Sequence, residues 1–302
     1  MTKNESIAKR YDEAIQSFVD KIKNDPNIIA VLVSGSVYHG TVWEKSDVDM
    51  TVVVRDQKLD NKSFGIYEDN ILLNVRLCQR SDLKRGMEKS LTGMTGHSID
   101  ATTKVVYTTD ENLRDYIEEN RAVGKADAEK AVFELANWLM GIMEKIEKWL
   151  KVKNDPAYAQ FYVLKAAEVI AEIEVCSRCM VPTREAILQA KELNPPLIEK
   201  FYSKPMSGLM TEKEIYKILD EMNTYIKTHM DEILNVARNF FGDGEIKTGT
   251  HISNHFNSNM HMLHPVMDYL CENGYLDKIS QTIRLTPKGR MSVEEIAFIM
   301  QD

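Results

Sequence analysis

The sequence contains two short polar motifs whose residue types and spacing suit phosphate and metal chemistry. Gly35 and Ser36 follow an apolar run of strand length, and Asp47 and Asp49 flank Val48 at the start of another. A glycine after a buried strand lets the backbone approach a phosphate, whose oxygens free N–H groups and a hydroxyl can bind. Side chains alternate along a strand, so both aspartates should face one side while Val48 is buried on the other.

Two carboxylates one strand step apart repel each other unless a cation lies between them. Hard oxygen ligands beside a phosphate site favour Mg²⁺, so Asp47 and Asp49 are the expected metal ligands. The chemistry that this arrangement predicts is in-line displacement at a nucleotide α-phosphorus. The metal would neutralise charge on the attacking and leaving oxygens.

Residues 34–49 read Ser-Gly-Ser-Val-Tyr-His-Gly-Thr-Val-Trp-Glu-Lys-Ser-Asp-Val-Asp. This GSxxxG element followed by SDVD resembles the signature of the DNA polymerase β-like nucleotidyltransferase superfamily, and most closely its minimal and antibiotic-modifying branches. The resemblance implies that Gly35 and Ser36 hold the triphosphate and that Asp47 and Asp49 are catalytic residues that bind Mg²⁺. It also makes Lys165 a nucleotide-binding candidate, because related enzymes present a helical cation to the triphosphate.

What the resemblance implies is an enzyme that transfers a nucleotidyl group, by family default AMP from ATP, to a hydroxyl of a small-molecule acceptor. Tyr38 and His39 lie inside the phosphate loop and are weaker candidates for lining the site. An acidic protein suits a cationic acceptor such as an aminoglycoside. The sequence does not identify the acceptor or the nucleobase.

The family's third carboxylate, on the next core strand, is missing from this sequence. The strand expected at 71–77 carries Asn74 and Arg76 as its inward polar residues, and the best register places Arg76 at the position of the acid. A guanidinium cannot bind a cation, which puts turnover in doubt.

Three alternatives follow from the missing acid. In the first, another carboxylate replaces it, with Glu68, Asp69 and Asp100 as candidates. In the second, the helical domain supplies the base, as in aminoglycoside nucleotidyltransferases, from Glu168 or Glu172. In the third, the domain is degenerate and acts as a nucleotide-binding sensor or protein-interaction module.

The elements that must position these residues form an α+β nucleotidyltransferase domain over residues 1–120, a small mixed sheet with flanking helices. Apolar runs of strand length and helical periodicity predict its elements. The expected strands are 28–35, 49–54, 71–77 and 103–107, and the expected helices are 4–24, 81–91 and 110–120.

Two further domains are expected. Residues 121–242 have helical periodicity almost throughout, which predicts an all-α bundle on the acceptor side, with helices at 126–150, 157–180, 183–193 and 212–241. Residues 245–302 resemble a winged helix, with helices 251–259 and 261–273, a two-stranded wing over 278–290 and a short helix from Ser292. Its presumptive recognition helix, 261–270, has no Lys or Arg, which disfavours DNA binding and favours docking on the rest of the protein, a second subunit or another partner. A homodimer is left open.

Composition bounds the remaining function classes. The chain has 302 residues and a net charge of −8, which argues against extended nonspecific contact with nucleic acid. No apolar run approaches the roughly 20 residues of a membrane-spanning helix, and the N-terminus has no apolar signal core. We therefore expect a cytoplasmic protein without a membrane partner.

Cysteine and histidine clusters are interpreted as structural. Cys176 and Cys179 are expected to be two buried small residues one turn apart in a helix, rather than half of a zinc site. The histidines at 251, 255, 261 and 264 have helical spacing, and capping and packing are the favoured roles for them over metal binding.

Overall fold

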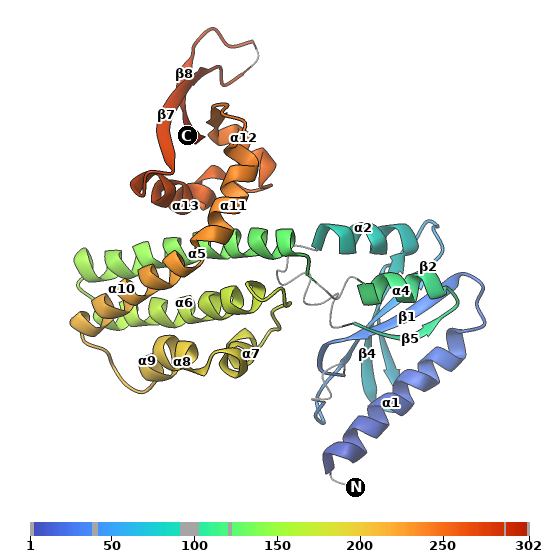
Figure 1. Cartoon of the computed structure of the whole chain (residues 1–302). Helices are drawn as coiled ribbons and strands as arrows, with labels where there is room; N and C mark the ends of the chain where they lie inside the picture. Colours follow the sequence, from blue (N-terminus) through green and yellow to red (C-terminus); the bar gives the residue numbers. More distant parts are fainter. Residues whose placement is uncertain (1–2, 38–41, 91–102, 120–122, 287, 301–302) are drawn as a thin grey trace. The chain divides into compact units, whose positions relative to one another are not determined.

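The computed structural model describes residues 3–37, 42–90, 103–119, 123–286 and 288–300 (Figure 1). The chain divides into two compact units. The N-terminal unit comprises Met1–Gly124 with Cys179–Arg184, and the C-terminal unit comprises Lys125–Arg178 with Glu185–Asp302. None of the helices in the described ranges is long and apolar enough to cross a membrane.

The N-terminal unit is built on a five-stranded sheet with the order β3-β4-β2-β1-β5. Strand β2 runs parallel to β4, and the other neighbours are antiparallel. The strands are β1 (Ile28–Ser34), β2 (Val48–Val54), β3 (Ser63–Glu68), β4 (Ile71–Gln79) and β5 (Lys104–Thr108), and a 3-10 turn, η1 (Gly35–Val37), follows β1. The four strands predicted from apolar runs are confirmed.

Helices cover both faces of this sheet, and each face has its own core (Figure 1). Helix α1 (Lys3–Ile22) buries Tyr11 and Phe18 against one face, where even-numbered β2 residues such as Val52 point. Helices α2 (Arg80–Ser90) and α4 (Glu111–Glu119) lie on the other face, the one to which odd-numbered β2 residues point. A fully buried Val, Leu or Phe side chain contributes about 1.5–3 kcal/mol, so these helices fix the sheet firmly.

The C-terminal unit is helical apart from a small sheet with the order β6-β8-β7. Its longer helices are α5 (Lys125–Lys151), α6 (Pro156–Cys176), α7 (Ala186–Leu193), α10 (Glu212–Thr228), α11 (Met230–Phe241) and α13 (Met260–Glu272). The shorter elements are α8 (Pro195–Ile198), the π-helical turn η2 (Glu199–Ser203), α9 (Lys204–Met206), β6 (Lys247–Thr248), α12 (Gly249–His255), β7 (Leu276–Ile283) and β8 (Val293–Met300).

One hydrophobic core runs from the bundle helices into the C-terminal segment. Phe133 of α5, Phe241 of α11, Val266 of α13 and Phe298 of β8 are all fully buried members of this core. This shared core marks no boundary between the two ranges. The division into a bundle at 121–242 and a separate domain at 245–302 therefore stays a prediction.

The side chain of Asn137 links α5 to α13 by hydrogen bonds within this core. Asn137, 3% exposed, donates from Nδ2 to the carbonyl of Met262 and accepts the N–H of Val266 on Oδ1 at 3.1 Å. Pro265 lies inside α13 and has no N–H, so the helical hydrogen-bond ladder is interrupted there. Asn137 satisfies backbone groups at the point where the helix needs external partners.

Three predicted elements are wrong, and one strand was missed. The two-stranded wing expected over 278–290 is wrong, because that range contains most of β7 and its partner strand is β8, beyond residue 290. The helix expected from Ser292 is strand β8, which pairs with both β6 and β7; a short apolar run of this length fits a helix or a strand equally well. Strand β3 was not predicted. The single helix expected at 212–241 is two helices that meet at His229.

Candidate functional site

The two aspartates lie at the start of β2, on the face opposite α1. Asp47 precedes the strand and Asp49 is its second residue; both are exposed, whereas Val48 between them is fully buried. This is the alternation that the Asp-Val-Asp pattern predicts. Burial of Val48 in the α1 core therefore holds both carboxylates at the open edge of the sheet.

Gly35 is required at its position for two separate reasons. Its φ of +76° lies in the left-handed region, which residues with a Cβ rarely adopt. A Cβ built there would also lie 3.3 Å from Oδ2 of Asp49. Ser34 pairs with Asp49 across the two strands, so β1 brings the glycine directly to the carboxylates. The backbone of Ser36 continues into η1, whereas its side chain, Tyr38 and His39 lie outside what the structure describes.

Asn74, not Arg76, is the β4 side chain that contacts the aspartates. Its Nδ2 donates to Oδ2 of Asp47 at 2.6 Å and lies 3.5 Å from Oδ1 of Asp49. The parallel register pairs Asp49 with Asn74 and Thr51 with Arg76. The predicted register, which put Arg76 at the acid position, is therefore wrong by two residues, because β-strand pairing is a long-range contact that a strand's own sequence does not encode.

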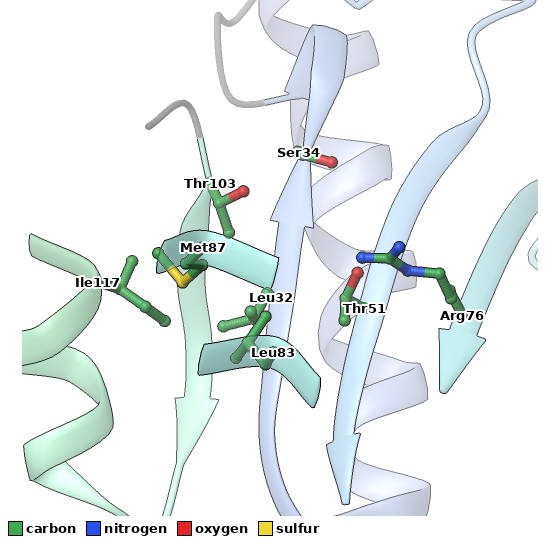
Figure 2. A pocket seen from close by; sticks show the side chains of 8 residues that line it. All are labelled: Leu32, Ser34, Thr51, Arg76, Leu83, Met87, Thr103 and Ile117. Carbon is green, nitrogen blue, oxygen red and sulfur yellow. The ribbon is translucent and has the colours of Figure 1, made fainter. Parts of the chain in front are cut away.

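Arg76 instead lines a cavity that adjoins the carboxylates. The cavity lies between the sheet and helices α2 and α4 (Figure 2), and its walls are Leu32, Ser34, Thr51, Arg76, Leu83, Met87, Thr103 and Ile117. Figure 2 shows the guanidinium of Arg76 extending from β4 toward Thr51. Sequence reasoning did not identify Ser34 or Thr51, although both share the strand face of Asp49 and could have been found from that alternation.

The residues of this site fall inside a recognised family model. Residues 16–112 match the model described as Polymerase beta, Nucleotidyltransferase. These residues form a nucleotidyltransferase domain of the polymerase β-like superfamily. The match covers the Gly35 turn, both aspartates and Asn74. No curated protein matches the chain.

A solved structure shares the fold over nearly the whole chain. The nucleotidyltransferase-like protein from Exiguobacterium sibiricum 255-15 is 12% identical and has a TM-score of 0.66, covering 96% of this chain and 99% of that chain. The spectinomycin adenyltransferase from Enterococcus faecialis, solved with ATP and spectinomycin, is 13% identical over 72% of this chain and 99% of that chain. Its TM-score of 0.33 is too low to support any argument.

The donor set of the nucleotidyltransferase domain fits a Mg²⁺ ion. Mg²⁺ is commonly bound by one or two carboxylates together with substrate phosphates and water, and Asp47 and Asp49 supply that pair. Rotation of the Asn74 amide would turn its oxygen toward the same point. The described residues contain no group of three or more His, Cys, Asp and Glu side chains that could hold a metal ion, so the site has two carboxylates and the Asn74 amide.

Neither Glu68 nor Asp69 forms a group of three metal-binding side chains with this pair. Glu68 is buried at the end of β3, where Nζ of Lys21 donates to Oε2 at 2.7 Å and Oγ of Ser17 donates to Oε1. These hydrogen bonds, chiefly from Lys21, hold the pKa of Glu68 below its usual range. Asp69 lies in the β3–β4 turn with a φ of +48°. Asp100 lies outside the described residues.

The candidates on α6 belong to the C-terminal unit. Nζ of Lys165 lies 4.8 Å from the ring centroid of Phe161 and 5.4 Å from that of Tyr162, so its predicted contact with the triphosphate stays a prediction. Glu172 is half-buried: burial raises its pKa to about 7, and the carboxylate of Glu168 one turn earlier adds to the rise.

Three histidines of the predicted cluster, His251, His255 and His264, have structural contacts. His251 accepts the N–H of Thr248 in a capping box, His255 stacks on Phe240 with a centroid distance of 4.2 Å, and His264 pairs with Asp268. The cysteine prediction is wrong in part. Burial raises the pKa of Cys176 to about 12, but α6 ends there, and Cys179 is exposed with a φ of +55°.

Proposed function

We propose that this protein is a Mg²⁺-dependent nucleotidyltransferase that moves a nucleotidyl group, AMP from ATP, to a hydroxyl of a small-molecule acceptor. The observation that carries the proposal is the convergence of Asp47 and Asp49 beside Gly35 in a polymerase β-type domain. Each group has a distinct task, which follows from its place on the strand.

The turn after β1 would bind the phosphates. Gly35, in the left-handed region, opens the 3-10 turn η1, and a left-handed residue at the start of such a turn can point successive backbone N–H groups into one concave site for an anion. The absence of a Cβ leaves Asp49 accessible beside that site. The backbone would therefore hold the phosphates next to the carboxylates.

Asp47 and Asp49 would hold the Mg²⁺ ion, and Asn74 would orient Asp47 through its hydrogen bond. When bound, the ion neutralises charge on the oxygens of the reacting phosphate. A short contact from an amide N–H to one of two neighbouring carboxylates also reduces their mutual repulsion. Asn74 thus supports the ion site without supplying a charge of its own.

The direct test is calorimetric titration of ATP into the Asp47→Asn/Asp49→Asn double variant in the presence of Mg²⁺. We expect affinity to fall more than tenfold, because the substituted amides are neutral and bind Mg²⁺ weakly. Asp60→Asn is the matched control, since Asp60 is an exposed acid elsewhere in the same unit. Unchanged affinity in the double variant would refute the assignment of the site.

A second function is favoured by one observation. Asn74 is an amide at the point where a third carboxylate would face the pair, which suits a degenerate domain that binds nucleotide and signals to partners. Asn74→Asp separates the two functions. Pyrophosphate release from ATP with a panel of hydroxyl acceptors, present in the wild type and raised in the variant, supports the enzyme. Release that arises only in the variant supports the sensor.

We also propose that residues 245–302 form a winged-helix-like module that contacts protein rather than DNA. Its element order, β6-α12-α13-β7-β8, supports this interpretation. Asp268 on α13 pairs with His264 and with Lys278 of β7, so two groups that could contact a DNA phosphate are already engaged by an acid. A gel-shift with strong salt dependence would contradict the proposal.

A further inference from the structure

The cavity beside the carboxylates is a separate feature of the same sheet face. Ser34, Asp49 and Thr51 share that face on β1 and β2, and Asn74 and Arg76 share it on β4. Residues two apart on a strand are separated by about 7 Å, so Thr51 lies about 7 Å from Asp49 along β2, and Arg76 lies about 7 Å from Asn74 along β4. In both strands this direction leads away from Gly35.

Among the described residues, three other arginines of the same unit are held in ion pairs, whereas Arg76 is not. Arg80 is paired with Asp110, Arg85 with Asp82 and Arg114 with Glu111. Within the described part of the chain, the side chain of Arg76 takes part in no ion pair or hydrogen bond. A guanidinium held against a cavity wall without a carboxylate leaves its planar donor fork free for an external anion.

The cavity walls suit the end of a small anionic group. Ser34 and Thr51 add two hydroxyls on the same sheet face as the guanidinium, and Leu83, Met87 and Ile117 supply buried apolar walls. Apolar walls lower the local dielectric, which strengthens a charge-assisted hydrogen bond. The cavity volume of about 30 Å³ suits a carboxylate or part of a phosphoryl group but is too small for a nucleobase.

We propose that this cavity is an anion subsite in which Arg76, Ser34 and Thr51 bind a carboxylate or phosphate monoester carried by the acceptor. The assignment to the acceptor rests on the proposed function. In an in-line displacement the attacking and leaving groups lie on opposite sides of the phosphorus. The Gly35 turn is placed for the leaving triphosphate end, and Arg76 lies on the other side of Asp49.

The subsite changes the expected acceptor class. The net charge of −8 suggested a cationic acceptor such as an aminoglycoside, but a local guanidinium within a few ångströms outweighs distant surface charge that salt screens. The acceptor would carry a hydroxyl to react and an acidic group to anchor it. This chemistry would discriminate against cationic acceptors, because Arg76 would repel them.

The test is titration of inorganic phosphate, without Mg²⁺, into isotopically labelled protein at constant ionic strength, followed through backbone amide shifts. We expect shifts at Ser34 and Thr51, affinity at least tenfold weaker in Arg76→Gln, and unchanged affinity in Arg55→Gln. Arg55 is the matched control, since it lies just beyond the far end of β2 and, among described residues, its side chain bonds only the Pro26 carbonyl. A parallel titration with acetate distinguishes carboxylate from phosphate as the preferred anion.

A second variant guards against misfolding of Arg76→Gln. Thr51→Val keeps the side-chain volume and removes one hydroxyl, and we expect it to weaken phosphate binding about threefold to tenfold, as loss of one hydrogen bond does. Equal phosphate affinity in wild type, Arg76→Gln and Thr51→Val would overturn the subsite.

The ATP affinity separates this proposal from the proposed function. We expect Arg76→Gln to bind Mg²⁺–ATP within threefold of wild type, and Asp47→Asn/Asp49→Asn to lose ATP while keeping phosphate at Ser34 and Thr51. Loss of Mg²⁺–ATP binding in Arg76→Gln would assign Arg76 to the triphosphate and overturn the acceptor assignment. Failure of wild type to bind Mg²⁺–ATP would refute the proposed function alone.

Discussion

Polar residues differ in exposure and hydrogen bonding between the two units of this chain. In the N-terminal unit the polar residues of the site, Asp47, Asp49 and Arg76, are exposed. In the C-terminal unit Asn137 and Glu174 are buried, at 3% and 5% exposure, and each is bound by several partners. Open polar groups with unused hydrogen-bonding capacity indicate binding, whereas buried and fully bonded groups indicate a structural role.

The Glu174 cluster shows the structural case clearly. Its carboxylate accepts hydrogen bonds from Nη2 of Arg178 at 2.6 Å, Nδ2 of Asn194 at 3.1 Å and the hydroxyl of Tyr225 at 3.4 Å. Burial, reinforced by the charge of Glu174, raises the pKa of Tyr225 well above its usual value, so the phenol stays a donor at any physiological pH. Removal of such a group should affect folding and leave nucleotide binding unchanged.

The largest stability loss is expected for Asn137→Ala. The substitution leaves the Met262 carbonyl and the Val266 N–H without their partner inside the core, at about 1–3 kcal/mol for each buried group. We expect urea unfolding to show a loss of about 2–4 kcal/mol, with ATP affinity unchanged.

Asn273→Ala is the control for this substitution, because its amide bonds the Tyr269 carbonyl at the exposed end of the same helix. It should cost less than about 1 kcal/mol. A cost for Asn137→Ala as small as the control would show that α13 satisfies those backbone groups by itself and would remove the contrast between the units.

A smaller stability effect with a functional component is expected for Gly35→Ala. The left-handed φ of +76° costs a residue with a Cβ about 1–2 kcal/mol, and the added methyl would lie 3.3 Å from Oδ2 of Asp49. We expect a loss of stability in that range together with weaker Mg²⁺–ATP binding, measured by urea unfolding and calorimetry on the same sample.

The matched control is Gly86→Ala in α2, where a Cβ would meet no atom within 4 Å. A helical Gly-to-Ala substitution should raise stability by about 0.5–1 kcal/mol and leave nucleotide binding intact. Equal behaviour of the two variants would mean that the conformation of Gly35 has no role in the site.

A stability effect that depends on pH is expected at Glu172. Its folded-state pKa is raised from 4.5 to about 7 by burial, so its contribution to stability is full below pH 4.5 and is lost as the pH rises through 7. Glu172→Gln should therefore raise Tm more at pH 8 than at pH 5, relative to wild type. A gain that is the same at both pH values would show that Glu172 ionises normally in the folded protein.

Local patterns were sufficient for much of the fold and for half of the site. The apolar runs predicted β1, β2, β4 and β5, and the Asp-Val-Asp alternation predicted which side of β2 carries the carboxylates. Strand β3 was missed because its side chains are mostly exposed, so it has no buried apolar run.

Long-range contacts account for the rest. The β2–β4 register decides whether Asn74 or Arg76 faces the aspartates, and no feature inside residues 71–77 encodes it. The bonds of Asn137 to α13 span more than a hundred residues of sequence and leave no periodic signal. The same holds for the cavity of Arg76, which depends on where α2 and α4 pack.

The most direct test of the account is calorimetric titration of wild-type protein with ATP, with and without Mg²⁺. We predict binding that requires Mg²⁺ and that Asp47→Asn/Asp49→Asn abolishes without a change in stability larger than about 1 kcal/mol. Binding that is equally strong without Mg²⁺, or that survives in the double variant, would contradict the assignment of the carboxylate pair.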